Sequence, residues 1–362
     1  MQVKIKGVSN YKPGAAKTNG STPVVSAKEY ASDQEIRWCP GCGDYSILKQ
    51  VQTVLAEENL TREDIVFISG IGCSSRFPYY MNTYGMHSIH GRATAIASGL
   101  KAIRKDLSVW IVTGDGDALS IGGNHLIHLL RRNFNVNILL FNNEIYGLTK
   151  GQYSPTSPKG TVNKTAIYGT IDQPFNPIAL ALGADASFVA RGLDVDPKQL
   201  RDVVKRANAH QGTSFLEIYQ NCNVFNDGAF AAFTDKSVRK NHTITLEHGQ
   251  PLVFGADDDK GIIIDGYRPK IVALSDGYSR NDLWVHDEND FYKATLLSRF
   301  FNDPSQESAF PRPLGVIFEV DRPTYEDALH EQKDKAVEQR GKGDLVNLFK
   351  GKDYWEVNKS SR

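Results

Sequence analysis

The chain has 362 residues, enough for one large domain or two modest ones with a substantial core. Hydrophobic residues make up 40% and charged residues 23% of the chain, which is typical of a globular protein and excludes wholesale disorder. Lys plus Arg and Asp plus Glu both number 42, so no global basic field predicts binding to nucleic acid or to an anionic membrane. The longest apolar runs are far shorter than a membrane span, and we expect a soluble, cytosolic protein.

Residues 1–35 are polar and show neither helical nor strand periodicity, so they are predicted to form an N-terminal arm. Between residues 36 and 225, apolar strand-like runs alternate with helical patterns. The strand-like runs lie at 64–70, 108–117, 136–144 and 214–221, and the helical patterns at 46–59, 93–105, 125–133, 174–184 and 197–210. Because the strands are too apolar to have a solvated face, the pattern predicts an α/β fold, with a parallel sheet covered by helices on both faces.

Beyond residue 225 the pattern changes, and residues 226–362 are predicted to form a C-terminal extension that contacts another subunit. A hairpin is expected within 251–265, around a Gly-Ala-Asp turn. A strand at 315–320 leads to a helix that begins near Thr324, because Asp327 follows it with the spacing of a helix cap.

Two polar motifs follow neighbouring strands of the predicted sheet. Gly114, Asp115 and Gly116 end one strand, and Asn142 and Asn143 end the next. The carboxyl ends of parallel strands meet at one edge of a sheet, so the Asp115 carboxylate and the Asn143 amide oxygen are expected close together, as hard ligands for Mg²⁺. The glycines would let backbone amides approach phosphate groups. The simpler interpretation is that both motifs are only tight turns.

The four cysteines form one close pair, Cys39 and Cys42, and two distant single residues, Cys73 and Cys222. Four thiolates suit either a tetrahedral zinc ion or a [4Fe–4S] cluster. Structural zinc usually takes two close pairs, so this distribution favours a cluster. A thioredoxin-like redox pair at Cys39 and Cys42, or buried free cysteines, remain alternatives.

Five segments together resemble the β subunits of 2-oxoacid:ferredoxin oxidoreductases: WCPGCGDYSIL, GIGCSSRFPYY, HGRATAIASGLK, GDGDALSIGGNHL and NNEIYGLTKGQYSPTS. The resemblance runs from about Trp38 to Asn226 and is nearest to the 2-oxoglutarate type. It implies a thiamine diphosphate-binding fold over 36–225, in which this chain binds the diphosphate.

The resemblance also implies particular ligands. Mg²⁺ would be held by Asp115, Asn143 and the Ile145 carbonyl, and one [4Fe–4S] cluster by the four cysteines. The implied contacts with thiamine diphosphate are Gly41, Cys42, Gly72, Ser74, His90, Gly114, Asp115, Gly116, Asp117, Asn143, Ile145, Tyr146, Gly147, Leu148 and Thr149.

Three further residues are candidates for catalysis. His90 and Arg92 lie before a predicted helix, where either could face the phosphates or a substrate carboxylate. Lys150 could pair with the distal carboxylate of 2-oxoglutarate, although from the bare sequence a solvated lysine is the simpler interpretation.

The expected function is oxidative decarboxylation of 2-oxoglutarate, with coenzyme A taking the acyl group and ferredoxin taking the electrons. An α subunit would supply the pyrimidine-binding domain and its activating glutamate, in an α2β2 assembly. Three alternatives stay open: a pyruvate or broad-specificity enzyme of the same kind, a thiamine-dependent carboligase without electron transfer, and a non-enzymatic zinc or iron–sulfur module.

Overall fold

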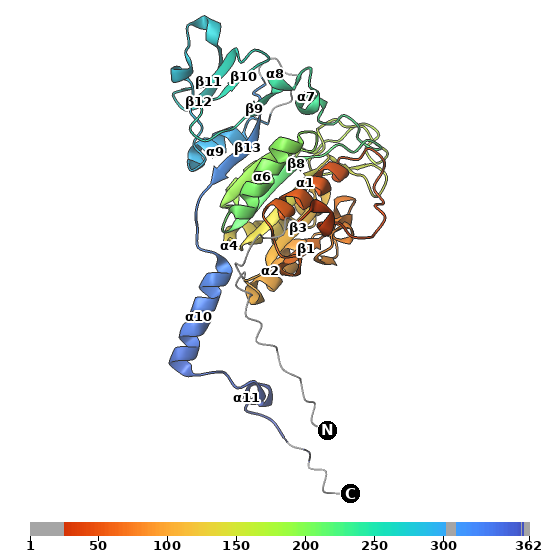
Figure 1. Ribbon diagram of the computed structural model, residues 1–362, viewed down its shortest axis with the longest axis vertical. Coiled ribbons are helices and arrows are strands. Elements are labelled where there is room, and N and C mark those ends of the chain that lie inside the picture. Colours follow the sequence, from red (N-terminus) through yellow and green to blue (C-terminus); the bar gives the residue numbers. More distant parts are fainter. Residues whose placement is uncertain (1–24, 302–308, 356, 358–362) are drawn as a thin grey trace.

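The computed structural model describes residues 25–301, 309–355 and 357, so most of the predicted N-terminal arm lies outside the described residues. Figure 1 shows a central sheet between layers of helices, a small second sheet at one end, and a helical arm near the C-terminus that leads away from the body.

The central sheet has eight strands in the order β2-β1-β3-β4-β8-β7-β13-β9. Six are mutually parallel: β1 Ile65–Ser69, β2 Tyr84–His87, β3 Ser108–Gly114, β4 Val136–Asn142, β7 Phe188–Leu193 and β8 Thr213–Tyr219. β13 Arg312–Glu319 pairs antiparallel with β7 and parallel with β9 Thr243–Thr245. Two smaller sheets consist of β5 Ile145–Tyr146 with β6 Gln152–Tyr153, and of β10 Val253–Phe254, β11 Lys260–Asp265 and β12 Arg268–Ala273.

Helices cover both faces of the sheet, as the sequence predicts. α1 Asp44–Glu57 and α6 Pro197–Ala209 pack on one face, and α2 Ala93–Ile103, α4 Gly123–Arg132 and α5 Pro177–Gly183 on the other. Strand β3 shows the division, because Trp110 and Val112 point into the first layer while Val109 and Ile111 point into the second.

The shorter and outlying helices complete the fold. They are α3 Asp115–Leu119, α7 Ala231–Thr234, α8 Arg239–His242, α9 Phe291–Ser298, α10 Tyr325–Arg340, α11 Leu345–Lys350, and the 3₁₀ helices η1 Ala27–Tyr30, η2 Arg62–Asp64, η3 Ser74–Tyr80, η4 Leu274–Asp276 and η5 Arg280–Asp282. Among the helices of the described ranges, none is long and apolar enough to cross a membrane.

The described end of the predicted arm packs against the core. Tyr30 is fully buried among the aromatic and aliphatic side chains of the α1 layer, and its hydroxyl donates to the Leu60 carbonyl at 2.5 Å. Residues 25–35 are therefore anchored to the body of the protein.

The region after residue 225 is not a simple appendage, because β13 and β9 lie in the central sheet. The expected hairpin forms as β10 and β11, and α10 begins after Thr324, whose side chain accepts a hydrogen bond from the Asp327 amide. A domain boundary at 225 stays a prediction, but it would cut through a shared sheet.

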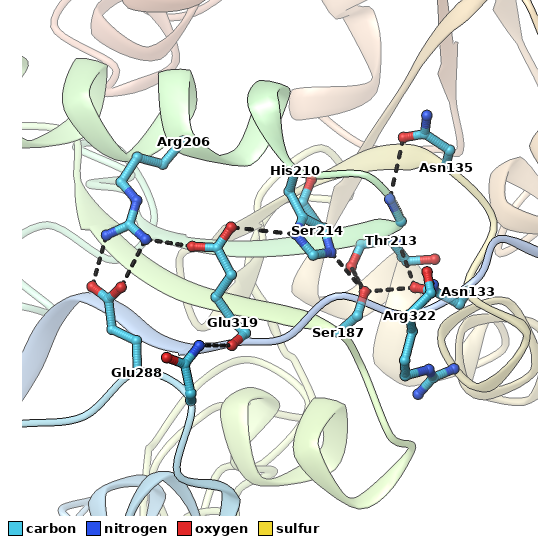
Figure 2. Close-up of polar contacts among 12 residues, drawn as sticks. Asn133, Asn135, Ser187, Arg206, His210, Thr213, Ser214, Glu288, Glu319 and Arg322 are labelled. Atoms are coloured by element: carbon cyan, nitrogen blue, oxygen red, sulfur yellow. Dashed lines mark hydrogen bonds and ion pairs between the residues drawn. The ribbon is translucent and has the colours of Figure 1, made fainter. Parts of the chain in front are cut away.

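A polar network fastens this region to the amino ends of the parallel strands (Figure 2). Arg206 on α6 donates to both carboxylate oxygens of Glu288 at 2.7 Å and also binds Glu319 at the end of β13. His210 Nε2 lies 2.7 Å from the hydroxyl of Ser187, which precedes β7. The network lies at the end of the sheet opposite the site described next.

Candidate functional site

The loops that follow β1, β2, β3 and β4 surround one cavity at the carboxyl ends of these strands. Ligands of open parallel sheets bind at this edge. The cavity is lined by Ile71, Gly72, Cys73, Ser74, His90, Gly114, Asp115, Gly116, Asp117, Asn143, Ile145, Tyr146, Gly147, Leu148 and Thr149. The structure thus brings together every predicted cofactor contact except Gly41 and Cys42, which line a neighbouring groove.

Asp115 lies at the first position of α3, directly after β3, and only 2% of its surface is exposed. Its Oδ2 accepts hydrogen bonds from the hydroxyls of Ser154 and Thr156, both at 2.5 Å. Burial raises the pKa of Asp115, and these two hydrogen bonds oppose the rise. A buried carboxylate at the wall of a cavity suits a cation there.

Asn143 and Ile145 also form part of the cavity wall. The Asn143 amide donates to Gln220 Oε1 at 2.8 Å, and Asn143 Oδ1 accepts from the Ile145 amide at 3.2 Å. Glu144, between them, has a left-handed backbone with φ of 57°. Asp115, Asn143 and Ile145 therefore line the same cavity, and their carboxylate, side-chain amide oxygen and backbone carbonyl are hard oxygen donors of the kind that fits Mg²⁺.

Gly116 allows the backbone to approach Tyr146 closely. A Cβ atom at this position would lie 2.2 Å from Tyr146 Cε1, and the Tyr146 hydroxyl donates to the Gly116 carbonyl at 2.9 Å. Any side chain at position 116 would displace the tyrosine from the cavity wall, because real Cβ atoms do not come so close to other atoms.

Asp117 is occupied by protein donors. Its Oδ1 accepts from the amides of Gly91 at 2.7 Å and Ile71 at 3.1 Å, and its Oδ2 accepts from Thr113 at 2.6 Å. His90 Nδ1 lies 2.6 Å from Oδ1, close but not aligned as a hydrogen bond. Asp117 thus ties the loops after β1 and β2 to α3 and keeps His90 at the cavity wall.

The structure does not bring Arg92 or Lys150 into the cavity lining. Arg92 caps the start of α2 and is half-buried. Lys150 is exposed, with a left-handed φ of 76°, one residue beyond Thr149 in the lining. Their catalytic roles stay predictions.

The four cysteines come from three segments that converge beside the cavity, since Cys39 and Cys42 share one of them, and all four are free thiols. A Cβ atom on Gly147 would lie 3.5 Å from Cys222 Sγ and 3.7 Å from Cys73 Sγ. Gln220 Nε2 lies 3.3 Å from Cys42 Sγ, so this thiol reaches the same region. Gly147 therefore leaves open a space that two thiols border.

The chemistry of these thiols fits a cluster. Burial raises the pKa of Cys73 to about 12, so a cation must replace the proton before this sulfur can act as a thiolate ligand. Within the described ranges, no three His, Cys, Asp or Glu side chains come close enough to hold a single metal ion. A cubane binds each cysteine to a different iron, so its thiols need not gather as tightly as zinc ligands do.

Several residues of the site were not foreseen from the sequence. Ser154 and Thr156 bind Asp115, and Gln220 contacts both Asn143 and Cys42. Asp44 is 1% exposed, and burial raises its pKa to about 7, with nearby Asp194 adding to the rise. The one available signal was position, because Asp44 follows the Cys39–Cys42 segment, and Ser154 and Thr156 follow the Asn143 loop.

Comparison with known proteins gives three findings. Residues 70–218 match the family model described as thiamine pyrophosphate enzyme, C-terminal TPP binding domain. The chain is 52% identical to "2-oxoglutarate oxidoreductase subunit KorB" of Mycobacterium tuberculosis, over 91% of this chain and 88% of that protein. It is 39% identical to "2-oxoacid:ferredoxin oxidoreductase 2, subunit beta" of Aeropyrum pernix, over 55% and 64% of the two chains.

Among solved structures, a 2-oxoglutarate:ferredoxin oxidoreductase from Magnetococcus marinus is similar to this one. The two chains superpose with a TM-score of 0.71 and 31% sequence identity, covering 91% of this chain and 97% of the other. That structure holds 2-oxoglutarate, coenzyme A and succinyl-CoA.

Proposed function

The chain belongs to the β subunits of the 2-oxoacid:ferredoxin oxidoreductases, and we infer that it is the thiamine diphosphate-binding subunit of a 2-oxoglutarate:ferredoxin oxidoreductase. Such an enzyme converts 2-oxoglutarate and coenzyme A to succinyl-CoA and CO2 and reduces ferredoxin. As a β subunit the chain acts together with an α subunit. The observation that carries the proposal is the cavity lined by Asp115, Asn143, Ile145 and Cys73, with Cys222 close to Gly147 in its wall.

Asp115, Asn143 and the Ile145 carbonyl would hold Mg²⁺ and, through it, the diphosphate. Thiamine diphosphate, when bound, supplies an electron sink for decarboxylation of a 2-oxo acid. The buried Asp115 carboxylate would offset part of the metal charge. Gly114 and Gly116 would expose backbone amides to the phosphates at the start of α3.

Cys39, Cys42, Cys73 and Cys222 would hold a [4Fe–4S] cluster, which supplies one-electron transfer to ferredoxin. The location supports this role, because Cys73 both lines the cofactor cavity and borders the same space as Cys222. Electrons would therefore travel only a short distance.

His90 would bind the diphosphate or the substrate. Its Nδ1 lies against Asp117, which leaves Nε2 for a ligand in the cavity. The proposal has further parts: catalytic roles for Arg92 and Lys150, binding of coenzyme A, an α2β2 assembly and a cytosolic location.

The decisive experiment is anaerobic purification of the chain with its α subunit, followed by metal analysis and a viologen-reduction assay. We expect about four irons per β chain, as the cluster type requires, and coenzyme A-dependent reduction with 2-oxoglutarate. Cys222→Ala should remove the iron and the viologen reduction.

Four outcomes would each contradict a part of the proposal. Zinc without iron would favour a zinc-binding module, and bound thiamine diphosphate without iron would favour a carboligase. Faster turnover of pyruvate than of 2-oxoglutarate would favour the pyruvate or broad-specificity alternative. Turnover by the isolated chain would contradict the need for an α subunit.

A further inference from the structure

The turn Ser154–Ser157 directly follows the β5–β6 hairpin, and its three hydroxyl side chains are buried, with exposed fractions of 2% for Ser154, 1% for Thr156 and 4% for Ser157. Buried hydroxyls need hydrogen-bond partners, and the partners of this turn are informative. They lie on both segments that would hold the metal.

The first contact is with the segment after β3. Ser154 and Thr156 both donate to Oδ2 of Asp115, and both distances are 2.5 Å. Two donors on one oxygen fix the rotation of the carboxylate and leave Oδ1 free of both hydroxyls. Hydroxyl bonds to an ionised carboxylate are short and strong.

The second contact is with the segment after β4. Ser157 donates to the Glu144 carbonyl at 2.6 Å while its oxygen accepts from the Ser154 amide at 2.8 Å. Glu144 lies between Asn143 and Ile145, and its backbone is left-handed, so the chain bends between these two residues. Ser157 therefore holds that bend from its carbonyl side.

The single hydroxyl proton of Thr156 can be assigned to its bond with Asp115. Thr156 Oγ1 also lies 2.9 Å from Asn142 Oδ1, but a hydroxyl has one proton, and the carboxylate of Asp115 is the stronger acceptor. Asn142 Oδ1 is satisfied in another way, since it accepts from the Glu144 amide at 3.3 Å.

We propose that the turn Ser154–Ser157 is a positioning clamp that sets the two Mg²⁺-binding segments at a fixed separation before the metal binds. The proposal rests on the proposed function. Mg²⁺ demands near-octahedral geometry, so ligands that are already in place bind it more tightly than ligands that must be ordered. Ser154, Thr156 and Ser157 are not among the residues that line the cavity, so they would act through Asp115 and Glu144.

The test measures Mg²⁺ affinity in the purified complex with the α subunit, by equilibrium dialysis with saturating thiamine diphosphate. Thr156→Val and Ser157→Ala should each weaken Mg²⁺ binding by roughly 10–100-fold, the usual effect of removing a residue that orients a metal ligand. Thr156→Ser keeps the hydroxyl and should restore most of the affinity. Thr161→Val is the matched control, because its hydroxyl donates to the Pro158 carbonyl outside the clamp.

Further measurements distinguish a failure of the clamp proposal from a failure of the proposed function. At saturating Mg²⁺, kcat of Ser157→Ala should return toward the wild-type value, which a direct catalytic role would not allow. Melting curves of the metal-free complexes show whether each variant is folded. If the wild type binds Mg²⁺ and both hydroxyl variants bind it equally well, the clamp is refuted. If the wild type shows no Mg²⁺-dependent binding of thiamine diphosphate, the proposed function itself fails.

Discussion

The acidic residues around the cavity have different partners, and these partners decide what each can do. Oδ2 of Asp115 accepts from two hydroxyls, and Oδ1, which accepts from neither of them, is the oxygen that we assign to a cation. Asp117 accepts from two amides and a hydroxyl, so its role is to hold the surrounding loops in place. Burial, with Asp115 adding to it, raises the pKa of Glu144 to about 8, so this side chain contributes little negative charge near neutral pH.

Gly116 offers a direct test of the cavity wall. Gly116→Ala would place a methyl group 2.2 Å from Tyr146 Cε1, and relief of such overpacking typically costs about 1–3 kcal/mol. We expect thiamine diphosphate binding to weaken roughly tenfold or more, since 1.4 kcal/mol corresponds to a factor of ten. Calorimetric titration of the metal-loaded complex measures this. Gly123→Ala is the control, because no atom outside the neighbouring backbone of its own helix lies within 4 Å of its Cβ position. Equal affinity of both variants would refute the role of Gly116.

Lys150 tests the choice of substrate. The distal carboxylate of 2-oxoglutarate must leave water on binding, and a facing cation lowers that cost, whereas pyruvate has a methyl group there. Lys150→Gln should raise KM for 2-oxoglutarate more than for pyruvate. The difference between the two substrates should correspond to about 1–3 kcal/mol of binding free energy, the effect of a lost charge-assisted contact. Lys159→Gln is the control, because Lys159 is also exposed and lies outside the cavity lining. Equal changes for both substrates would show that Lys150, which lies outside the cavity lining, stays in solvent.

At the scale of elements, a buried ion pair joins three neighbouring strands behind the cofactor cavity. Arg191 on β7 donates to Glu217 on β8 at 2.7 Å, and Asn142 on β4 donates to the other Glu217 oxygen at 2.8 Å. Arg191 also donates to the Pro313 carbonyl of β13 at 3.0 Å. The end of β4, which leads to Asn143, is thereby connected to the C-terminal strand.

This ion pair explains a strand that the sequence did not predict. No strand was expected at 188–193, because Arg191 and Gly192 interrupt its apolar pattern. The charge is tolerated through Glu217, which is distant in sequence and adjacent in the sheet. By contrast, β3 and β4 were predicted with Asp115 and Asn143 at their ends, since a strand–helix–strand unit depends on local sequence alone.

Removing one partner of this pair should destabilise the fold. Arg191→Met leaves the Glu217 carboxylate buried and unpaired, which typically costs about 3–5 kcal/mol. Adding Glu217→Gln removes that charge and keeps an oxygen to accept from Asn142, so the double variant should be more stable than Arg191→Met alone. Urea unfolding of the isolated chain measures the free energy of unfolding of the single and the double variant. A double variant less stable than the single one would show that the charge is not the cause.

His286 provides a pH test of the contact between the small sheet and β13. Burial lowers its pKa, although nearby Glu288 and Asp287 oppose this; its Nε2 lies 2.9 Å from the Val316 carbonyl, and Nδ1 is buried without a partner. Below pH 6.5 the unfolded state therefore takes up the proton first, and stability falls as the pH falls. In His286→Gln the loss of urea stability between pH 7.5 and 5.5 should be smaller. An unchanged loss would exclude His286 as a source of acid sensitivity.

At the scale of the whole molecule, the sequence predicted a sheet between two layers of helices. It did not predict that strands from the C-terminal region complete this sheet. Residues 312–319 were recognised in part as a strand, yet their place beside β7 depends on pairing with residues more than a hundred positions earlier. The approach of Ser154 and Thr156 to Asp115 has the same cause, because a loop and not a periodic element brings them there. Local patterns predict elements, and contacts between distant segments require the folded chain.

The shared core leads to a prediction about truncation. Ile244, Leu252, Phe254, Trp284 and Ile317 lie beyond residue 225 and pack in the same hydrophobic cluster as the side chains of β3 and α4. A chain that ends at residue 225 would lose β9 and β13 and would expose one face of that cluster. We therefore expect it to be insoluble, or to unfold without a cooperative transition.

A chain that ends at Arg340 should behave differently. It lacks α11, which has no buried residue, and its removal leaves every strand of the central sheet in place. Its melting temperature should match that of the full chain, as measured by circular dichroism. The exposed side chains of Leu348 and Phe349 would then be lost without cost to the fold. If this truncation weakened co-purification with the α subunit, it would place the predicted subunit contact on α11. A soluble 1–225 chain with an unchanged melting temperature would show instead that the C-terminal region is dispensable for the core.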